Sequence, residues 1–157
     1  MTSDRTKGIA GAVLAKARLI DQRITATAET IQAWAECFGN AELWPTEALA
    51  AVAEHYSRAN PYPLMPGDVI EYCRAQPVWS SADHAAQFLE KWSDYPFSEA
   101  IAAWSGITPP IETLPTDMTA ADERAFHATH LRKWVAKNRD VLIGAILSRR
   151  YVPQEYT

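Results

Sequence analysis

The chain contains little glycine and no run of β-branched residues. Six of its 157 residues are glycine, alanine is abundant, and segments rich in valine, isoleucine and threonine are missing. Such segments are typical of strands, whereas alanine and long unbranched side chains favour helix. The composition therefore predicts an all-α protein. A hydrophobic fraction of 48% and six tryptophans supply enough apolar side chains for a packed core.

Long apolar runs and cysteine pairs are also missing. The first residues, MTSDRTKGIAGAVLAKARLID, lack the extended apolar core and cleavage site of a signal peptide. No run approaches the roughly 20 apolar residues that span a bilayer. Cys37 and Cys73 both lie in apolar helical patterns. We therefore expect a cytoplasmic protein that makes no membrane contact and whose cysteines are reduced core residues.

Sequence signatures of enzymes and metal centres do not occur. The chain has no GxxxxGK[ST] phosphate loop, no strand-linked GxGxxG and no HExxH pattern. Glu123, His127 and His130 have helical spacing, but a solvated helix face is a better interpretation than a metal site. Nothing in the sequence brings Cys37 together with His55 or His84 as nucleophile and base. We therefore expect a non-enzymatic protein that needs no cofactor or metal.

Helical periodicity and capping signals predict four helices in the first half. The first two extend from Asp4 to about Asp21 and from a Thr27 cap to the left-handed stop at Gly39-Asn40. Prolines suit the first turns of the third and fourth helices. The third helix is expected to bury one face and to expose the other. Its predicted buried residues are Leu49, Val52, Ala53 and Tyr56, and its predicted exposed residues are Glu47, Glu54 and Arg58.

A proline-rich segment, NPYPLMP, joins the third and fourth helices. Each proline removes a backbone donor and disfavours helix at the residue before it. The connector from Asn60 to Met65 is therefore expected to be short, stiff and extended. Together with Pro66 it forms a structural joint, beneath which Tyr56, Met65 and Val69 are expected to pack.

The second half is divided by a proline-containing stretch. Residues 78–105 are predicted to form short helices, the first capped by Ser81. Residues 106–118 hold three prolines and show little periodicity, which indicates a linker or surface loop. A basic helical region is predicted over 119–157. The expected fold is thus a compact four-helix unit over 1–77 followed by a smaller helical C-terminal region.

The aromatic residues of the middle region leave two alternatives open. Trp79, Trp92 and Trp104 lie beside the segment Tyr95-Pro96-Phe97. Aromatic side chains are enriched as anchors of protein interfaces. They are also ordinary core residues of small helical proteins. The spacing of these residues favours neither alternative.

Charge is distributed unevenly along the chain. Residues 1–123 hold eight Lys and Arg against seventeen Asp and Glu, whereas residues 124–150 hold seven basic residues against Asp140 alone. The candidate contacts to a partner or to nucleic acid are Arg132, Lys133, Lys137, Arg139, Arg149 and Arg150. A basic helix adds salt-dependent affinity for phosphates, and its cations are equally suited to an acidic protein surface. Trp134 is expected to pack inward with Leu131 and Val135, the alternative being stacking on a base.

The order of residues in AETIQAWAECFGNAELWPTEALAAVAEHYSRANPYPLMPGDVIEYCR resembles small phage and prophage proteins of the helicase loader/inhibitor type. The matching positions are Ala33-Trp34, Ala48 to Ala53, His55-Tyr56 and Met65-Pro66-Gly67-Asp68-Val69. The match covers residues 5–76, and residues 79–157 do not match. The resemblance implies a compact helical helicase-loader-like domain over 1–77 that belongs to a protein binding the replicative hexameric helicase. In that family the C-terminal part carries the helicase contact.

Three functional hypotheses follow from these observations. The first is a non-enzymatic phage or prophage replication accessory protein, loader or inhibitor, that binds the replicative helicase. The second is a DNA-binding regulator that uses the basic C-terminal helix. The helix after the joint is a poorer candidate for DNA, because Asp68 and Glu71 outnumber Arg74 there. The third hypothesis is a small phage protein that binds another host factor.

Overall fold

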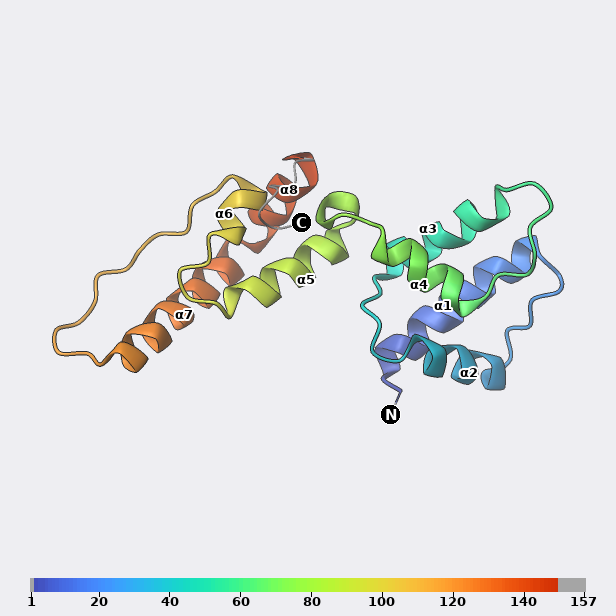
Figure 1. The fold of residues 1–157 in the computed structure, drawn as a ribbon, viewed down its shortest axis with the longest axis horizontal. Coiled ribbons are helices and arrows are strands. Elements are labelled where there is room, and N and C mark those ends of the chain that lie inside the picture. Colours follow the sequence, from blue (N-terminus) through green and yellow to red (C-terminus); the bar gives the residue numbers. More distant parts are fainter. Residues whose placement is uncertain (1, 150–157) are drawn as a thin grey trace. The chain divides into compact units, whose positions relative to one another are not determined.

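The computed structural model describes residues 2–149 and divides into two compact units, the first ending at Pro77 and the second beginning at Val78 (Figure 1). Every regular element of the described residues is helical, which confirms the predicted all-α fold. None of the described helices combines the length and the apolar character that crossing a membrane would require.

The first unit holds four helices, which begin where capping residues place them. They are α1 (Asp4–Ile20), α2 (Ala28–Phe38), α3 (Pro45–Tyr56) and α4 (Pro66–Arg74). The predicted Thr27 cap of α2 is confirmed, because the Thr27 hydroxyl accepts a hydrogen bond from the Thr30 N–H at 3.2 Å. Ser3, and not Asp4, caps α1, since its hydroxyl accepts from the Thr6 N–H at 3.1 Å. A hydroxyl one residue before the first turn is the usual N-cap.

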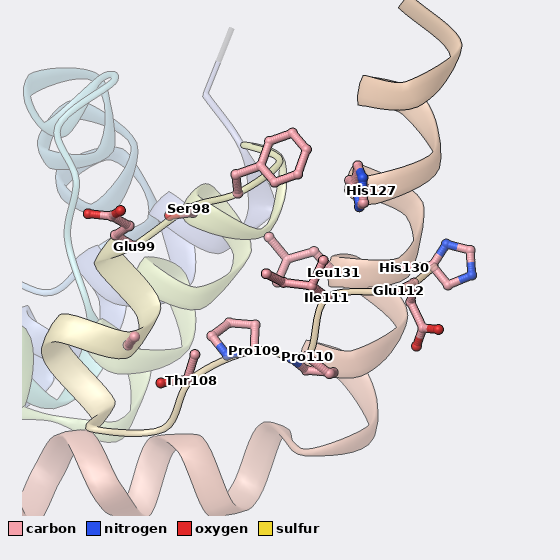
Figure 2. Close-up of a pocket in the computed structure, with 12 residues that line it drawn as sticks. Ser98, Glu99, Thr108, Pro109, Pro110, Ile111, Glu112, His127, His130 and Leu131 are labelled. Carbon is pink, nitrogen blue, oxygen red and sulfur yellow. The ribbon is translucent and has the colours of Figure 1, made fainter. Parts of the chain in front are cut away.

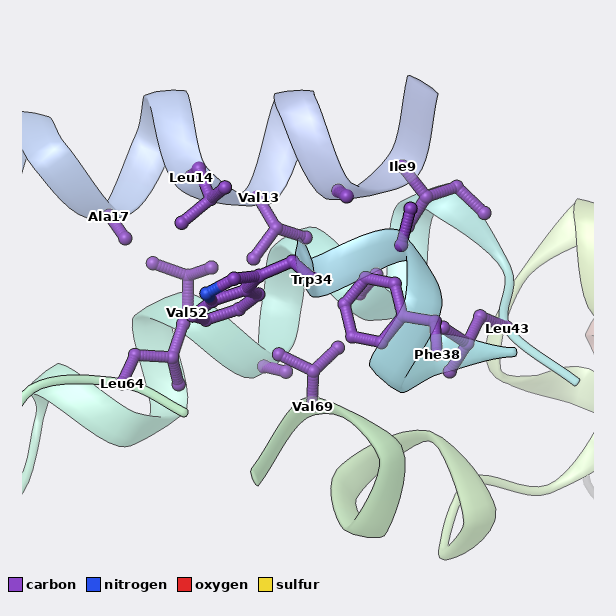
Figure 3. Close-up of a cluster of buried hydrophobic side chains, with 14 of the residues drawn as sticks. Ile9, Val13, Leu14, Ala17, Trp34, Phe38, Leu43, Val52, Leu64 and Val69 are labelled. Atoms are coloured by element: carbon purple, nitrogen blue, oxygen red, sulfur yellow. The ribbon is translucent and has the colours of Figure 1, made fainter. Parts of the chain in front are cut away.

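The core of the first unit is built around two aromatic rings of α2. Helix α1 packs against α2 and α3, and α4 packs against the same two helices (Figure 1). Figure 3 shows Trp34 and Phe38 between the apolar face of α1 and Val69 of α4. The two rings meet edge to face with centroids 6.0 Å apart, an arrangement that aromatic pairs favour.

The buried face of helix α3 is shifted by about one residue from the predicted buried face. Glu47, which was expected to face water, is buried, whereas Ala53 is exposed. The buried residues of α3 are Glu47, Ala48, Ala51, Val52 and His55. Because α3 lies against both α1 and α4, its buried face is set by these two neighbours and not by its own apolar residues. Glu54 and Arg58 are exposed as predicted.

The second unit has one shared core. Its elements are a 3₁₀ turn (Val78–Ser80), α5 (Ala82–Ser93), α6 (Ala100–Ser105), α7 (Ala120–Lys137) and α8 (Arg139–Arg149). Side chains of all four α-helices meet in that core. The predicted segments 78–105 and 119–157 therefore belong together over their described residues. Residues 106–118 do not separate two bodies, because they form a connector within this unit.

The tryptophans of the second unit belong to its core. Trp104 is buried, and Trp79 and Trp92 pack against the same cluster. The ring centroids of Trp79 and Trp104 lie 5.7 Å apart. Tyr95 and Phe97, in contrast, each expose more than half of their surface. The interface alternative therefore stays open for these two residues, and the core alternative holds for the tryptophans.

The two cysteines differ in environment. Cys73 is buried as predicted, and burial raises the pKa of its thiol to about 11. Cys37 is exposed, so its predicted place in the core is wrong. The buried face of α2 is carried by Trp34, Ala35 and Phe38, and Cys37 points away from that face.

We expect the two thiols to react with Ellman's reagent in two separate phases. Cys37 reacts at once, whereas Cys73 reacts only as the first unit unfolds, because its thiol is both inaccessible and protonated. The Cys37→Ser variant isolates the slow phase. Rapid modification of Cys73 in the folded Cys37→Ser protein would contradict the buried position.

Candidate functional site

The proline joint is held by a hydrogen-bond network around one tyrosine hydroxyl. The Tyr56 hydroxyl donates to Asp21 Oδ2 at 2.9 Å and accepts from the Leu64 N–H at 3.1 Å. Arg23 donates to Asp21 Oδ1 at 2.9 Å and to the Pro61 carbonyl at 3.0 Å. The network therefore joins the end of α1, the end of α3 and the connector. The sequence pattern predicted the joint but not these partners.

The side chains under the joint differ in part from the prediction. Val69 is fully buried, as expected, and Pro66 occupies the first position of α4. Met65 is 56% exposed, which contradicts its predicted packing, and Leu64 is buried in its place. Neighbouring residues of an extended segment point to opposite sides, so burial of Leu64 turns Met65 outward. The Met65 N–H instead donates to Asp68 Oδ2 at 2.9 Å and closes the first turn of α4.

His55 is a buried structural residue of this joint. It is buried, and its Nε2 lies 2.6 Å from the Tyr62 carbonyl oxygen. Because a carbonyl only accepts hydrogen bonds, Nε2 carries a proton and donates it. The imidazole also packs edge to face against the rings of Tyr56 and Tyr62. His55 thus holds the connector in place. Because His55 is buried and Cys37 is exposed, the two side chains lie in different environments.

The histidines of α7 do not form a metal site with Glu123. His127 Nε2 lies 4.0 Å from Glu123 Oε1, but His130 Nδ1 lies 2.9 Å from the Phe126 carbonyl of its own helix. Within residues 2–149, no group of three His, Cys, Asp or Glu side chains is placed to hold a metal ion.

Two of the predicted basic contacts on α7 are unengaged. Lys133 and Lys137 are exposed, lie one turn apart and make no ion pair with the described residues. Arg132 Nε lies 3.3 Å from Asp94 Oδ1, and both side chains are more than half exposed. Trp134 packs against the core of the second unit, as predicted, together with Leu131 and Val135. The two lysines therefore lie on the exposed side of a helix whose opposite side packs in the core of the second unit.

The remaining basic contacts lie on α8 or beyond it. Arg139 is exposed, and its Nη1 lies 3.8 Å from the oxygen of the fully exposed Asp140. An exposed pair of this length contributes little to stability. Arg149 is the last residue of α8, and the predicted contact at Arg150 lies outside the described residues. The described basic surface is thus centred on α7.

A pocket of about 300 Å³ lies in the second unit between α6, the connector and α7 (Figure 2). Its lining residues come from three segments of the chain, and most of the lining surface is apolar. They are Phe97, Ser98, Glu99, Ala102, Thr108, Pro109, Pro110, Ile111, Glu112, His127, His130 and Leu131. A cavity of this size and character is within the range of ligand and side-chain binding sites.

One wall of this pocket is a phenylalanine with an unusual backbone. Phe97 has a φ of 61°, in the left-handed region that bulky residues rarely adopt. Its ring lies over His127, with centroids 4.3 Å apart, and 57% of the residue is exposed. Sequence reasoning missed this pocket. The available signal was Ile111, an isolated large apolar residue directly after Pro109-Pro110.

No protein-family model, curated protein or solved structure matches this chain. The function is therefore inferred from the residues and the geometry described above. The resemblance to helicase loaders depends on residue order in the first unit alone.

Removal of the Tyr56 hydroxyl is expected to destabilise the first unit. Tyr56→Phe keeps the ring but leaves the buried Asp21 carboxylate and the Leu64 N–H without this partner, which costs about 1–3 kcal/mol. Tyr62→Phe is the matched control, because the exposed Tyr62 hydroxyl donates to Asp68 at 2.7 Å and its loss costs about 0.5 kcal/mol or less. Urea denaturation compares the two variants. Equal losses would contradict the central role of Tyr56.

Acid is expected to weaken the joint through Asp21. Hydrogen bonds from Arg23 lower the pKa of the Asp21 carboxyl from 3.8 to about 2. Between these pH values the unfolded chain binds more protons than the folded one, so stability rises with pH. The contribution is complete above pH 3.8 and is lost as the pH falls towards 2.

The measurement is the urea midpoint as a function of pH in this acid range. Asp21→Asn should flatten the dependence, whereas Asp4→Asn, which changes an exposed carboxylate of α1, should leave it as in the original protein. A dependence that Asp21→Asn leaves unchanged would show that other carboxylates cause the acid response.

Proposed function

We propose that this protein is a non-enzymatic replication accessory protein of phage or prophage type that binds the replicative hexameric helicase. One observation carries the proposal. Several of the residues that bear the resemblance to helicase loaders stabilise the first unit, since Trp34 and Val69 belong to its core and Tyr56 holds its joint. The likeness therefore includes residues on which the fold depends.

The second unit is the proposed contact. In the family that the sequence resembles, the helicase contact lies in the C-terminal part, and here that part offers Lys133 and Lys137 on α7. Leu131 and Val135 fix the helix in the core, so the two cations are held at a constant spacing. Paired cations on a rigid element complement an acidic protein surface and speed the encounter with it.

A non-enzymatic role is supported by what the titratable side chains already do. His55 donates to a carbonyl, His130 lies against its own helix backbone, and the Asp21 carboxylate is engaged by Arg23 and Tyr56. Groups held in this way stabilise the fold. They do not leave a nucleophile beside a base.

DNA binding is the second candidate, and the same lysines favour it. Two neutralised phosphates give a slope of about −2 in a plot of log affinity against log salt concentration. Lys133 and Lys137 thus support modest, sequence-independent affinity, and Arg132 already faces Asp94. Binding to a helicase surface requires shape as well as charge and is retained at salt concentrations that abolish such a DNA complex.

The test is binding of the purified full chain to the replicative helicase of the host bacterium. We expect a complex in biolayer interferometry and about a tenfold loss of affinity in Lys133→Glu/Lys137→Glu. The matched control is Lys7→Glu/Arg74→Glu, which reverses two exposed charges of the first unit and should leave the affinity within about twofold.

Parallel titrations with single- and double-stranded DNA at several salt concentrations separate the two candidates. Absence of a helicase complex with the full chain would overturn the proposal. Salt-sensitive DNA binding that depends on Lys133 and Lys137, without a helicase complex, would establish the second candidate in its place.

A further inference from the structure

The pocket of the second unit leaves large apolar side chains in water. Ile111 is 83% exposed and Phe97 is 57% exposed, although both line the pocket. Neither belongs to the hydrophobic core of this unit. The Phe97 ring is nevertheless held against His127 of α7. Exposed apolar residues gathered around a pocket mark an interaction surface and not a packing requirement.

The lining of the pocket includes two carboxylates. Figure 2 shows Glu99 and Glu112 on opposite sides of Ile111 and Leu131. The described residues that line the pocket include neither a lysine nor an arginine. His127, whose ring lies against that of Phe97, is also close to the carboxylate of Glu123. The charges around this apolar surface therefore favour a ligand that carries positive charge beside an apolar group.

Two residues of the pocket cannot donate a backbone hydrogen bond to an added strand. Pro109 and Pro110 have no N–H to offer to an extended peptide. On the other wall, the backbone groups of α7 around His127 and Leu131 are engaged within the helix. These two walls therefore favour recognition of a ligand by its side chains, as when an amphipathic helix lies in an apolar groove.

We propose that this pocket is a docking site for an amphipathic helical segment of a partner protein, with a large apolar side chain inserted beside Ile111 and Leu131 and a lysine or arginine next to it facing Glu99 or Glu112. The apolar side chain fills the pocket, and the neighbouring turn of the segment covers the exposed ring of Phe97. This site does not depend on the helicase proposal, because it uses neither Lys133 nor Lys137.

The probe is a set of fluorescein-labelled helical peptides that carry Leu, Phe or Trp at positions i and i+4 with lysine beside them. A second set has glutamate in place of each lysine. Fluorescence anisotropy with the full chain measures the affinity of both sets. We expect saturable binding of at least one lysine peptide, with a Kd below about 1 mM, and at least about tenfold weaker binding of its glutamate counterpart.

Matched variants of the full chain locate the binding. Ile111→Ser and Glu112→Gln should each weaken the binding of the lysine peptide at least about fivefold. Val141→Ser and Glu90→Gln are the controls, because they change an exposed apolar residue and an exposed carboxylate of the same unit outside the pocket. All four positions are exposed, so circular dichroism should report an unchanged fold.

Three results would overturn the docking site. They are the absence of saturable binding of every lysine peptide, equal binding of the lysine and glutamate sets, and losses in the control variants as large as those in Ile111→Ser and Glu112→Gln. The last result would indicate attraction to the acidic chain as a whole and no defined site.

Discussion

The hydroxyl of Tyr56 is the contact on which the first unit depends. A connector rich in proline has few backbone donors, and those that remain inside the fold need acceptors. Tyr56 supplies an acceptor to the Leu64 N–H and uses its own proton on Asp21, which Arg23 also holds. The joint thereby fixes the start of α4, and with it the position of Val69 against the rings of α2.

The connector of the second unit is also held by hydrogen bonds, but it serves a different purpose. The connector after α6 is tied at its beginning by Ser105, whose hydroxyl accepts from the Ile107 N–H at 3.1 Å, and by the left-handed turn at Gly106. Ile107 then packs against the core. In the first unit the apolar residue after the prolines, Leu64, is buried, whereas here Ile111 stays in water. The first connector stabilises the fold, and the second forms a wall of a pocket.

Local signals predicted the helices well, and tertiary contacts determined the rest. The caps at Thr27, Ser81 and Thr119 were recognisable because a hydroxyl directly before a helix accepts a hydrogen bond from the first turn of that same helix. The buried face of α3 depends on two neighbouring helices, so its own stripe misplaced Glu47. The pocket joins residues 97–99, 108–112 and 127–131, which no single periodic pattern connects. In the extended segment before α4, only one of the neighbours Leu64 and Met65 could be buried. The spacing of the prolines did not indicate which of the two it would be.

Both proposed contacts include residues of helix α7. Its buried residues, which include Leu131 and Val135, hold it in the core, and this leaves two surfaces of different character on one rigid element. The turns around His127 and Leu131 face an apolar pocket with carboxylates on either side, and the following turns present lysines that make no ion pair within residues 2–149. Opposite charges select different partner surfaces. The pocket and the lysines use different residues of α7, so substitutions can test each proposed contact without changing the other.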